Sequence, residues 1–435
     1  MGTLLKNALV VTQNSKRDIF TGDVLIIDQK IARVGKDLPA GGHTTIDLTN
    51  RILIPGFVQT HVHLCQTLFR NLADDLELLD WLKEYIWPME MAHTPETLRA
   101  SAQLGLSEML LGGTTTILDM GNGAHQEVIF EEMLHSGIRG FSGQVLMDTG
   151  AQPYKQTTGQ ALAESRRLIN DWHFKKSSRI GYALAPRFVP SCSKELWEGV
   201  RDLSERYNLI IHTHASENRT EWQMVHELTG YSNVDFFMQR GMASPRLCLA
   251  HCIWISPEEI DFMAEAGINV LHCPSANLKL GSGIAPIPEL YQAGVNIGLG
   301  ADGAACNNNL DIFMEMRLAA LIQKPRTGVK STNARMIFDM ANINGAKALG
   351  LENQIGSIEE GKLADLVVLN LNKVHCTPAD NVISQIVYSA NSGDVEHVII
   401  DGQWVVKNKT LLPYSTDEVV ENAWEQIHRL FEEAK

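Results

Sequence analysis

Histidine and aspartate residues recur at the ends of apolar segments along this chain. His61 and His63 form a His-Val-His pair after one such segment, and other segments end at His214, His251 and Asp302. In an extended strand, residues two apart point to the same side, so both imidazoles of the pair share one face. Two imidazoles, a third from another strand and a carboxylate suit Zn²⁺ or a similar divalent ion. One such pair alone is more often exposed or part of a core, but four strand ends of this kind predict a metal site.

Three further residues near these segments could take part in the chemistry. Glu217 lies three residues after His214 and could move protons at a metal-activated water, or it could begin the next helix on the surface. His212 shares a strand face with His214, and we prefer His214 as the ligand because it lies nearer the strand end. His272 also ends a strand, where it could lie behind the ligands, face a substrate or be a hydrogen-bonded core histidine.

Short apolar segments alternate with amphipathic helical stretches from Pro55 to about Leu351. This alternation predicts βα units and a parallel sheet, which is an α/β fold. Eight units over roughly 290 residues fit a (β/α)₈ TIM barrel, whose active-site residues lie at the carboxyl ends of the strands. Helical stretches such as Pro95–Leu111 and Ser193–Tyr207 separate the strands. The expected strands are Phe57–His61, Thr114–Asp119, Gly140–Leu146, Ile180–Ala185, Leu209–His214, Leu247–His251, Ile268–His272 and Val295–Ala301.

Both ends of the chain predict β-structure instead. Neither end has enough strands for a core of its own, so we expect one small β-sandwich domain built from both termini. The predicted division is residues 1–54 and 356–435 for this domain, with a terminal helix over Asp417–Lys435, and residues 55–355 for the barrel. The expected strands are Leu5–Thr12, Asp23–Ile27, Lys30–Val34, Leu366–Leu369, Glu396–Ile400 and Gln403–Val406.

The segment Gly298-Leu-Gly-Ala-Asp-Gly303 matches the GxGxxG pattern of dinucleotide-binding loops. In those loops the glycines open a helix, and an acidic residue follows about 20 residues later. Here Asp302 falls inside the pattern, a loop rich in asparagine follows it, and the segment lies in the eighth βα unit. We therefore do not expect a bound dinucleotide.

The composition excludes several classes of protein. The chain has 435 residues, of which 44% are hydrophobic and 20% charged, which is typical of a globular protein. The formal net charge of −14 argues against a nucleic-acid partner. No apolar run approaches the ~18 residues that a membrane helix needs, and the first residues lack the pattern of a signal peptide. The seven cysteines are odd in number and form no CxxC motif, which favours a reducing cytoplasm.

The motifs that contain these residues resemble the amidohydrolase superfamily. The subgroup is that of methylthioadenosine/S-adenosylhomocysteine deaminases, guanine deaminase and the s-triazine (ATZ/TRZ-like) hydrolases, and the resemblance covers nearly the whole chain. It rests on the segments PGFVQTHVH (55–63), HTHASE (212–217), HCPSANLKLG (272–281), GADG (300–303), EMRLAALIQK (315–324) and IGSIEEGKLAD (355–365).

The resemblance implies a metal centre and roles for its neighbours. One divalent ion per subunit, with Zn²⁺ preferred over Fe²⁺ or Mn²⁺, would be held by His61, His63, His214 and Asp302. Glu217 and Asp302 would take the proton of the attacking water, and His251 would face the substrate and stabilise the tetrahedral intermediate. The relatives also imply a homo-oligomer, a dimer or larger.

The residues that would contact the substrate match two different activities. Gln66 and the pair Arg187-Phe188 are similar to guanine deaminases, and a guanidinium beside an amide could bind a polar ring edge, although Arg187 could also form a loop salt bridge. Glu90 resembles the carboxylate by which nucleoside deaminases hold ribose hydroxyls, or it could cap a helix. Cys306 stands where many of those deaminases carry serine, and it could lie behind the ligands.

Together these features predict a metal-dependent hydrolase of non-peptide carbon–nitrogen bonds, a cyclic amidine deaminase. The expected substrates are adenosine derivatives, namely 5′-deoxyadenosine, methylthioadenosine or S-adenosylhomocysteine. Guanine or another aminopurine base is the alternative, and a chloro- or aminotriazine is third. A non-catalytic barrel for binding or assembly would be a different class, but such a protein would have no need to gather metal ligands.

Overall fold

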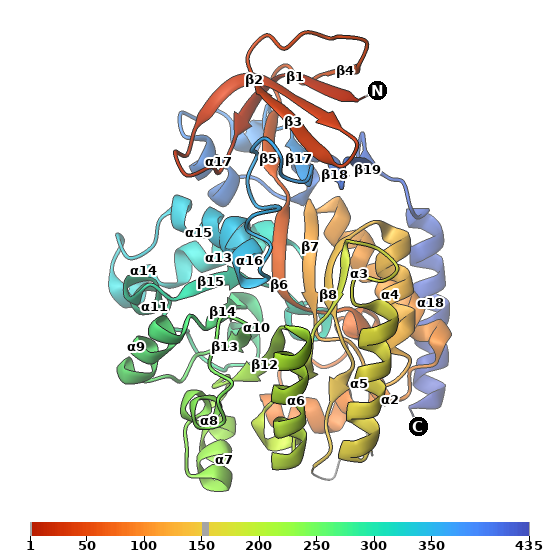
Figure 1. Cartoon of the computed structure of the whole chain (residues 1–435), viewed down its shortest axis with the longest axis vertical. Coiled ribbons are helices and arrows are strands. Elements are labelled where there is room, and N and C mark those ends of the chain that lie inside the picture. Colours follow the sequence, from red (N-terminus) through yellow and green to blue (C-terminus); the bar gives the residue numbers. More distant parts are fainter. Residues whose placement is uncertain (1, 150–155, 435) are drawn as a thin grey trace.

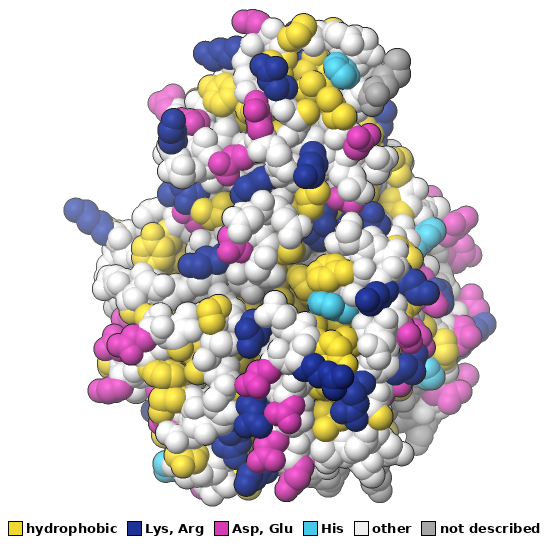
Figure 2. Space-filling view, in the orientation of Figure 1, with side chains coloured by type: hydrophobic (Ala, Val, Ile, Leu, Met, Phe, Trp, Pro, Cys, Tyr) yellow, Lys and Arg dark blue, Asp and Glu magenta, His cyan; other side chains and the backbone are white. Residues whose placement is uncertain are grey.

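The computed structural model describes residues 2–149 and 156–434. Strands from both ends of the chain lie together at one pole of the molecule, and helices surround a second sheet below them (Figure 1). Lysine and arginine side chains are interspersed with aspartate and glutamate on the lower part of the face in Figure 2. Among the described residues, we find no helix with the length and apolar character to cross a membrane.

The sheet at the pole joins the two termini. Its strand order is β20-β19-β18-β17-β5-β1-β2-β3, and β4 pairs with β1. Strand β5 is the junction, because it pairs in parallel with β1 and antiparallel with β17. The strands are β1 Thr3–Val11, β2 Ile19–Ile27, β3 Lys30–Gly35, β4 Thr44–Asp47, β5 Ile52–Pro55, β17 Leu366–Leu369, β18 Val395–Ile400, β19 Gln403–Lys407 and β20 Thr410–Leu411.

The central sheet has the order β10-β8-β7-β6-β15-β14-β13-β12, with β16 paired to β6. Every strand pair in it is parallel, so the expected α/β class is confirmed. The carboxyl ends of these strands therefore share one edge. The strands are β6 Phe57–His63, β7 Thr114–Asp119, β8 Arg139–Ser142, β10 Ile180–Tyr182, β12 Ile211–Ala215, β13 Leu247–His251, β14 Asn269–His272, β15 Asn296–Leu299 and β16 Asp302–Gly303.

The two end strands of this sheet, β10 and β12, are linked through Leu184. Its amide donates to the carbonyl of Ile210 at 2.9 Å, and its carbonyl accepts from the amide of His212 at 2.8 Å. A second isolated bridge pairs Phe188 with His214. These contacts hold the segment after β10 beside the strand that carries His214.

Two expected strands are interrupted near their ends. Gly140–Leu146 is divided into β8 and β9 (Val145–Leu146), and Ile180–Ala185 into β10 and β11 (Ala185–Pro186); β9 and β11 form a separate parallel pair. The backbones approach closely at this break, because a Cβ atom on Gly143 would lie 1.8 Å from the carbonyl oxygen of Ala183. Only glycine fits there, and a pattern of apolar residues does not reveal such an approach.

Helices cover the outer face of the central sheet (Figure 1). Helix α3 begins at the cap residue Thr94, whose side chain accepts from the amide of Thr97, and Ser193 caps α6 in the same way. The helices of the βα units and the C-terminal region are α3 Pro95–Leu111, α4 Gln126–Ser136, α5 Thr158–Trp172, α6 Lys194–Tyr207, α7 Arg219–Thr229, α8 Asn233–Gln239, α9 Pro257–Ala266, α10 Pro274–Lys279, α11 Ile287–Ala293, α12 Ala304–Asn307, α13 Ile312–Ile322, α14 Lys324–Thr327, α15 Ala334–Ala341, α16 Ile343–Ala348, α17 Val382–Tyr388 and α18 Thr416–Glu433. Short helices after β6 are η1 Leu64–Phe69, α1 Leu78–Trp81, η2 Leu82–Ile86 and α2 Trp87–Met91, and single turns lie at η3 Val189–Ser191, η4 Val374–Cys376 and η5 Ser392–Asp394.

A buried ion-pair network ties the central sheet to the terminal sheet. Arg139, on β8, donates to Asp365 at 2.6 Å and to Asp401 at 2.8 Å, and all three side chains are at most 3% exposed. The amide of Asp401 also donates to Asp365. Because two carboxylates bind one guanidinium, this network holds the central sheet and the terminal sheet together.

Candidate active site

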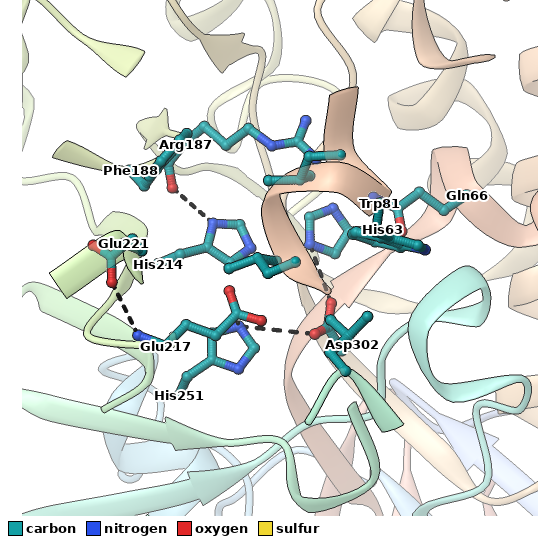
Figure 3. Close-up of a pocket in the computed structure, with 13 residues that line it drawn as sticks. His63, Gln66, Trp81, Arg187, Phe188, His214, Glu217, Glu221, His251 and Asp302 are labelled. Carbon is teal, nitrogen blue, oxygen red and sulfur yellow. Dashed lines mark hydrogen bonds and ion pairs between the residues drawn. The ribbon is translucent and has the colours of Figure 1, made fainter. Parts of the chain in front are cut away.

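The expected metal ligands come together at the carboxyl edge of the central sheet. His61 and His63 lie at the end of β6, His214 near the end of β12, and Asp302 begins β16. His251 is the last residue of β13, and its ring faces the same group. The labelled members of this group point toward one another in Figure 3.

The distances within this group fit a tetrahedral divalent ion. His61 Nε2 lies 3.4 Å and His63 Nε2 3.3 Å from Asp302 Oδ1. Two ligand atoms that are each about 2.0–2.1 Å from a tetrahedral zinc ion lie about 3.3 Å apart. Ligand atoms of His61, His63 and His214 also lie within 4.8 Å of one another. These residues therefore form a His/Asp metal-binding arrangement, and no ligand has to move far to close around an ion.

Hydrogen bonds leave the required ring nitrogens available. His214 Nδ1 lies 2.7 Å from the carbonyl oxygen of Arg187, which can only accept, so the Nδ1–H donates and Nε2 keeps its lone pair. Burial holds the pKa of His63 and His214 well below the ordinary value, so both rings are neutral at pH 7 and can bind a metal.

Asp302 is the carboxylate among the four expected ligands. Its burial acts to raise the pKa of the carboxyl, but the adjacent His61 and His63 outweigh this and hold that pKa well below the usual range. The residue is therefore ionised at neutral pH. An ionised buried carboxylate needs nearby positive charge, which a divalent ion would supply.

Backbone strain is concentrated at two of these residues. Asp302 has φ of 63° and His251 has φ of 72°, which is the left-handed region that few non-glycine residues adopt. Strained backbone conformations of this kind occur where the surrounding structure enforces them, and they are common at functional sites. Gly300 packs beneath this group, since a Cβ atom there would lie 2.5 Å from the carbonyl oxygen of His61.

The carboxylate of Glu217 lies beside the ring of His251. Its Oε2 atom lies 3.5 Å from His251 Nε2, and burial raises the pKa of the Glu217 carboxyl to about 7. On the other side of the imidazole, His251 Nδ1 lies 2.8 Å from the side-chain oxygen of Asn277, so the ring donates there. Glu221 Oε2 accepts from the amide of Glu217 and so fixes the turn that carries it.

A small cavity lies beside this group. Five of the six expected substrate-binding residues line it, namely Gln66, Arg187, Phe188, Glu217 and His251. The sixth, Glu90, is buried and is not among the described residues that line the cavity; it contacts Gln66 and Arg187. The apolar wall is formed by Leu78, Trp81, Leu82 and Leu280.

His272 and Cys306 lie outside the cavity lining. Both are buried, and Cys306 Sγ donates to the carbonyl of Gly303, the residue after Asp302. Burial lowers the pKa of His272 to about 3, so its ring is neutral. Neither side chain contacts the cavity, and both positions are compatible with the expected place behind the ligands.

Two contributors to the site were not identified in the sequence: Asn277 orients His251, and Glu221 supports Glu217. His212 was considered there only as an alternative to His214, and in the structure it contacts His61. Asn277 is part of the HCPSANLKLG motif, so the motif contained a signal for it. His212 and Glu221 act through partners on other strands or turns, which the sequence alone does not reveal.

Comparison with known proteins identifies the family. Residues 52–405 match the amidohydrolase family. The chain is 42% identical to a 5′-deoxyadenosine deaminase of Methanothermobacter thermautotrophicus, over 90% of each chain, and 39% identical to a 5-methylthioadenosine/S-adenosylhomocysteine deaminase of Thermococcus onnurineus, over 94% of this chain and 95% of the relative.

Among solved structures, a zinc-bound adenosine deaminase from Xanthomonas campestris superposes with a TM-score of 0.93 at 31% identity, over 99% of this chain and 98% of that one. A zinc-bound atrazine chlorohydrolase from Arthrobacter aurescens gives a TM-score of 0.92 at 27% identity, over 98% of this chain and 100% of that one. This chain belongs to the amidohydrolase family. The predictions of the family and of a hydrolase that acts on carbon–nitrogen bonds are confirmed.

Proposed function

We propose that this protein is a zinc-dependent deaminase of adenosine derivatives, with 5′-deoxyadenosine, methylthioadenosine and S-adenosylhomocysteine as the first substrates to consider. The names of the two relatives at 42% and 39% identity support this substrate class. The cluster of Glu217, His251 and Asp302 at one end of the cavity carries the proposal, because hydrolytic deamination needs a proton carrier beside an activated water.

One zinc ion per subunit would be held by His61, His63, His214 and Asp302. The tetrahedral spacing of these ligands and the zinc in two similar structures support this choice, and Fe²⁺ and Mn²⁺ suit the same ligands. When bound, the ion supplies a water molecule of lowered pKa, so that hydroxide is available near neutral pH.

The chain's own groups then handle the protons. Glu217, with a pKa of about 7, accepts a proton from the water as its oxygen bonds to the ring carbon that carries the amino group. The ring of His251, whose Nδ1–H donates to Asn277, can donate from Nε2 toward the oxygen of the tetrahedral intermediate when the ring carries a second proton. Glu217 returns the proton to the leaving nitrogen. Water and the amino heterocycle thus become the oxo heterocycle and ammonia.

The test is ammonia release by the zinc-loaded protein with S-adenosylhomocysteine, 5′-deoxyadenosine, guanine and an aminotriazine in parallel. Turnover of the two nucleosides with little release from the others is the expected result. Guanine turnover alone would overturn the proposed substrate class. Metal-loaded protein that releases no ammonia from any of the four would refute a deaminase of these compounds.

Guanine or another aminopurine base is the second candidate. Gln66, Arg187 and Phe188 all line the cavity, and an amide next to a guanidinium suits a ring edge with both donors and acceptors. This arrangement favours a base with polar groups on two sides. The ammonia assay above separates it from the first candidate.

We also propose the finer architecture on which this function rests. The hydrogen bonds of Leu184 between β10 and β12 support a closed (β/α)₈ barrel over residues 55–355, with a β-sandwich domain from residues 1–54 and 356–435. The seven cysteines are all free and buried, which supports a reducing cytoplasm. A homo-oligomer stays a prediction.

A further inference from the structure

The cavity beside the expected metal ligands is too small for the proposed substrates. Its volume is about 30 Å³, and a single water molecule needs about 10–15 Å³ of such space. The cavity therefore has room for about two water molecules. A purine ring is several times larger than that, so part of the cavity wall must move before a nucleoside can enter.

Most of this wall is tied to neighbouring elements. The wall residues on the central sheet, including His63 and His214, are fixed by strand pairing. Arg187 follows β11, and its amide donates to the carbonyl of Leu146 at 3.2 Å. The side chain of Glu221 accepts a hydrogen bond from α8. These parts of the wall cannot move without breaking hydrogen bonds between elements.

The segment of residues 75–89 lacks such connections. It includes α1, η2 and the start of α2, and it contributes Leu78, Trp81 and Leu82 to the wall (Figure 3). Within the part of the chain that the structure describes, no hydrogen bond or ion pair joins this segment to residues outside 75–92. Its buried side chains belong to a hydrophobic cluster separate from the main core. Apolar packing alone therefore holds the segment against the site.

The local structure of the segment also favours movement. Its turn η2 is π-helical, a rare form that is frequent at functional sites. The indole N–H of Trp81 is buried and has no hydrogen-bond partner among the described residues. A buried donor without a partner has a free-energy cost, which opening of the segment to water would remove.

Both ends of the segment are anchored. Just beyond one end, Glu90 pairs with Arg187. Just before the other end, Asp74 accepts from Lys279 Nζ at 2.5 Å, and Lys279 precedes the wall residue Leu280. Lys279 also donates to two acceptors at α12, so it keeps partners when Asp74 moves away. The Asp74–Lys279 pair thus connects the segment to another part of the wall.

We propose that residues 75–89 form a lid that opens to admit the substrate, and that the Asp74–Lys279 ion pair latches it closed. Opening takes Leu78, Trp81 and Leu82 away from the cavity and makes room for the ring. Closing returns this apolar wall and excludes bulk water from the reacting groups. The identity of the substrate rests on the proposed function, whereas the lid is inferred from the cavity volume and the contacts of the segment.

Hydrogen exchange of the zinc-loaded protein without substrate tests the lid and its latch. We expect the amides of residues 75–89 to exchange faster than those of α3. Asp74→Asn should accelerate exchange in the lid about two- to fivefold, because an exposed ion pair is a weak contact. Asp75→Asn is the matched control, since Asp75 is exposed and has a left-handed backbone that asparagine also adopts. Equal exchange in the two variants would refute the latch, and a lid that exchanges as slowly as α3 would refute the inference.

Trp81→Ala is a second variant with a larger expected effect. It removes much of the apolar packing, so exchange in the rest of the lid should rise on the order of 100-fold while α3 stays unchanged. Because α3 is measured in the same sample, a general loss of stability would be detected. Equal acceleration of α3 would mean that Trp81 stabilises the whole barrel and would contradict a separate lid.

A bound nucleoside separates this inference from the proposed function. In Glu217→Gln, 5′-deoxyadenosine at ten times its dissociation constant should slow exchange in the lid about 10-fold, because it binds beneath the closed segment. Bound nucleoside that leaves this exchange unchanged would contradict closure over the substrate. If the wild-type protein releases no ammonia from any adenosine derivative, the proposed function fails, and exchange in the unliganded variants still decides whether residues 75–89 form a lid.

Discussion

The Nδ1 atom of His61 lies 2.6 Å from the Nε2 atom of His212, and both rings are buried. One of the two nitrogens must carry the proton between them. Burial, together with the neighbouring His61 and His63, holds the pKa of His212 well below its ordinary value, so its ring is neutral and can accept. The pKa of His61 is lowered as well, so its ring is also neutral. If its single N–H is at Nδ1 and donates to His212, Nε2 stays an acceptor on the side of Asp302, as metal binding requires. In that arrangement His212 sets the tautomer of an expected metal ligand.

Replacing His212 with phenylalanine should therefore weaken metal binding. The ring shape is retained but the acceptor is lost, and the loss of such a supporting group costs about 10- to 100-fold in metal affinity. Zinc affinity is measured by competition with a chromogenic chelator. His272→Phe is the control, because His272 is equally buried but does not contact an expected ligand. Equal affinities of the His212→Phe variant and the wild type would contradict this role.

Replacing Glu217 with glutamine should preserve the metal and remove most turnover. The amide keeps the size of the side chain but cannot accept and return a proton, and general acid–base catalysis contributes about 10²- to 10⁴-fold. Zinc content by atomic absorption and kcat for 5′-deoxyadenosine are measured together. A variant with full zinc content and unchanged kcat would remove Glu217 from the mechanism.

The meeting of the expected ligand residues could be predicted from the sequence because each lies at a strand end, and the carboxyl ends of parallel strands must meet. The α/β class was predicted from the alternation of short apolar segments with amphipathic helical stretches. Contacts between strands that are distant in the sequence were not predictable. His61 and His212 are 151 positions apart, and Glu90 and Arg187 are 97 apart, so each contact depends on the register and on side-chain direction. The break at Gly143 was missed for a similar reason, since it arises from an approach of two backbones.

The free energy of unfolding should fall as the pH rises through the titration of Glu315. This carboxylate is fully buried, and burial raises its pKa to about 7, against contacts with Ser275 and Asn307 that act to lower it. A carboxyl whose pKa is higher in the folded state than in the unfolded state stabilises the fold at low pH, and this stabilisation is lost between its unfolded pKa near 4.5 and its folded value. The loss is on the order of 3 kcal/mol.

Urea unfolding of the wild type and Glu315→Gln at pH 5 and pH 9 tests this expectation. The histidine and aspartate ligands also titrate, so the informative quantity is the difference between the two proteins. We expect the variant to lose less stability than the wild type between the two pH values, because its side chain cannot ionise. Equal losses of stability in the two proteins would show that folding does not raise the pKa of Glu315, and would contradict this expectation.

Removing the metal should lower the melting temperature. An ion that binds only the folded state adds about 2.7 kcal/mol when its free concentration is 100 times its dissociation constant. Scanning calorimetry with and without a chelator should show this difference in the wild type and little of it in Asp302→Asn, because that change removes the anionic ligand. A melting temperature that does not respond to chelation in the wild type would argue against a bound ion at this site.

Replacing Arg139 with methionine should destabilise the whole fold. The change leaves Asp365 and Asp401 buried without their cation, and breaking a buried ion pair from one side costs about 3–5 kcal/mol. Arg167→Met is the matched control, because Arg167 on α5 pairs with Glu164, Asp171 and Glu127 at the exposed surface, where such pairs contribute about 0–1 kcal/mol. Urea unfolding of both variants gives the two losses. If Arg139→Met costs no more than Arg167→Met, the network does not hold the central sheet to the terminal sheet, and packing between the two sheets must do so instead.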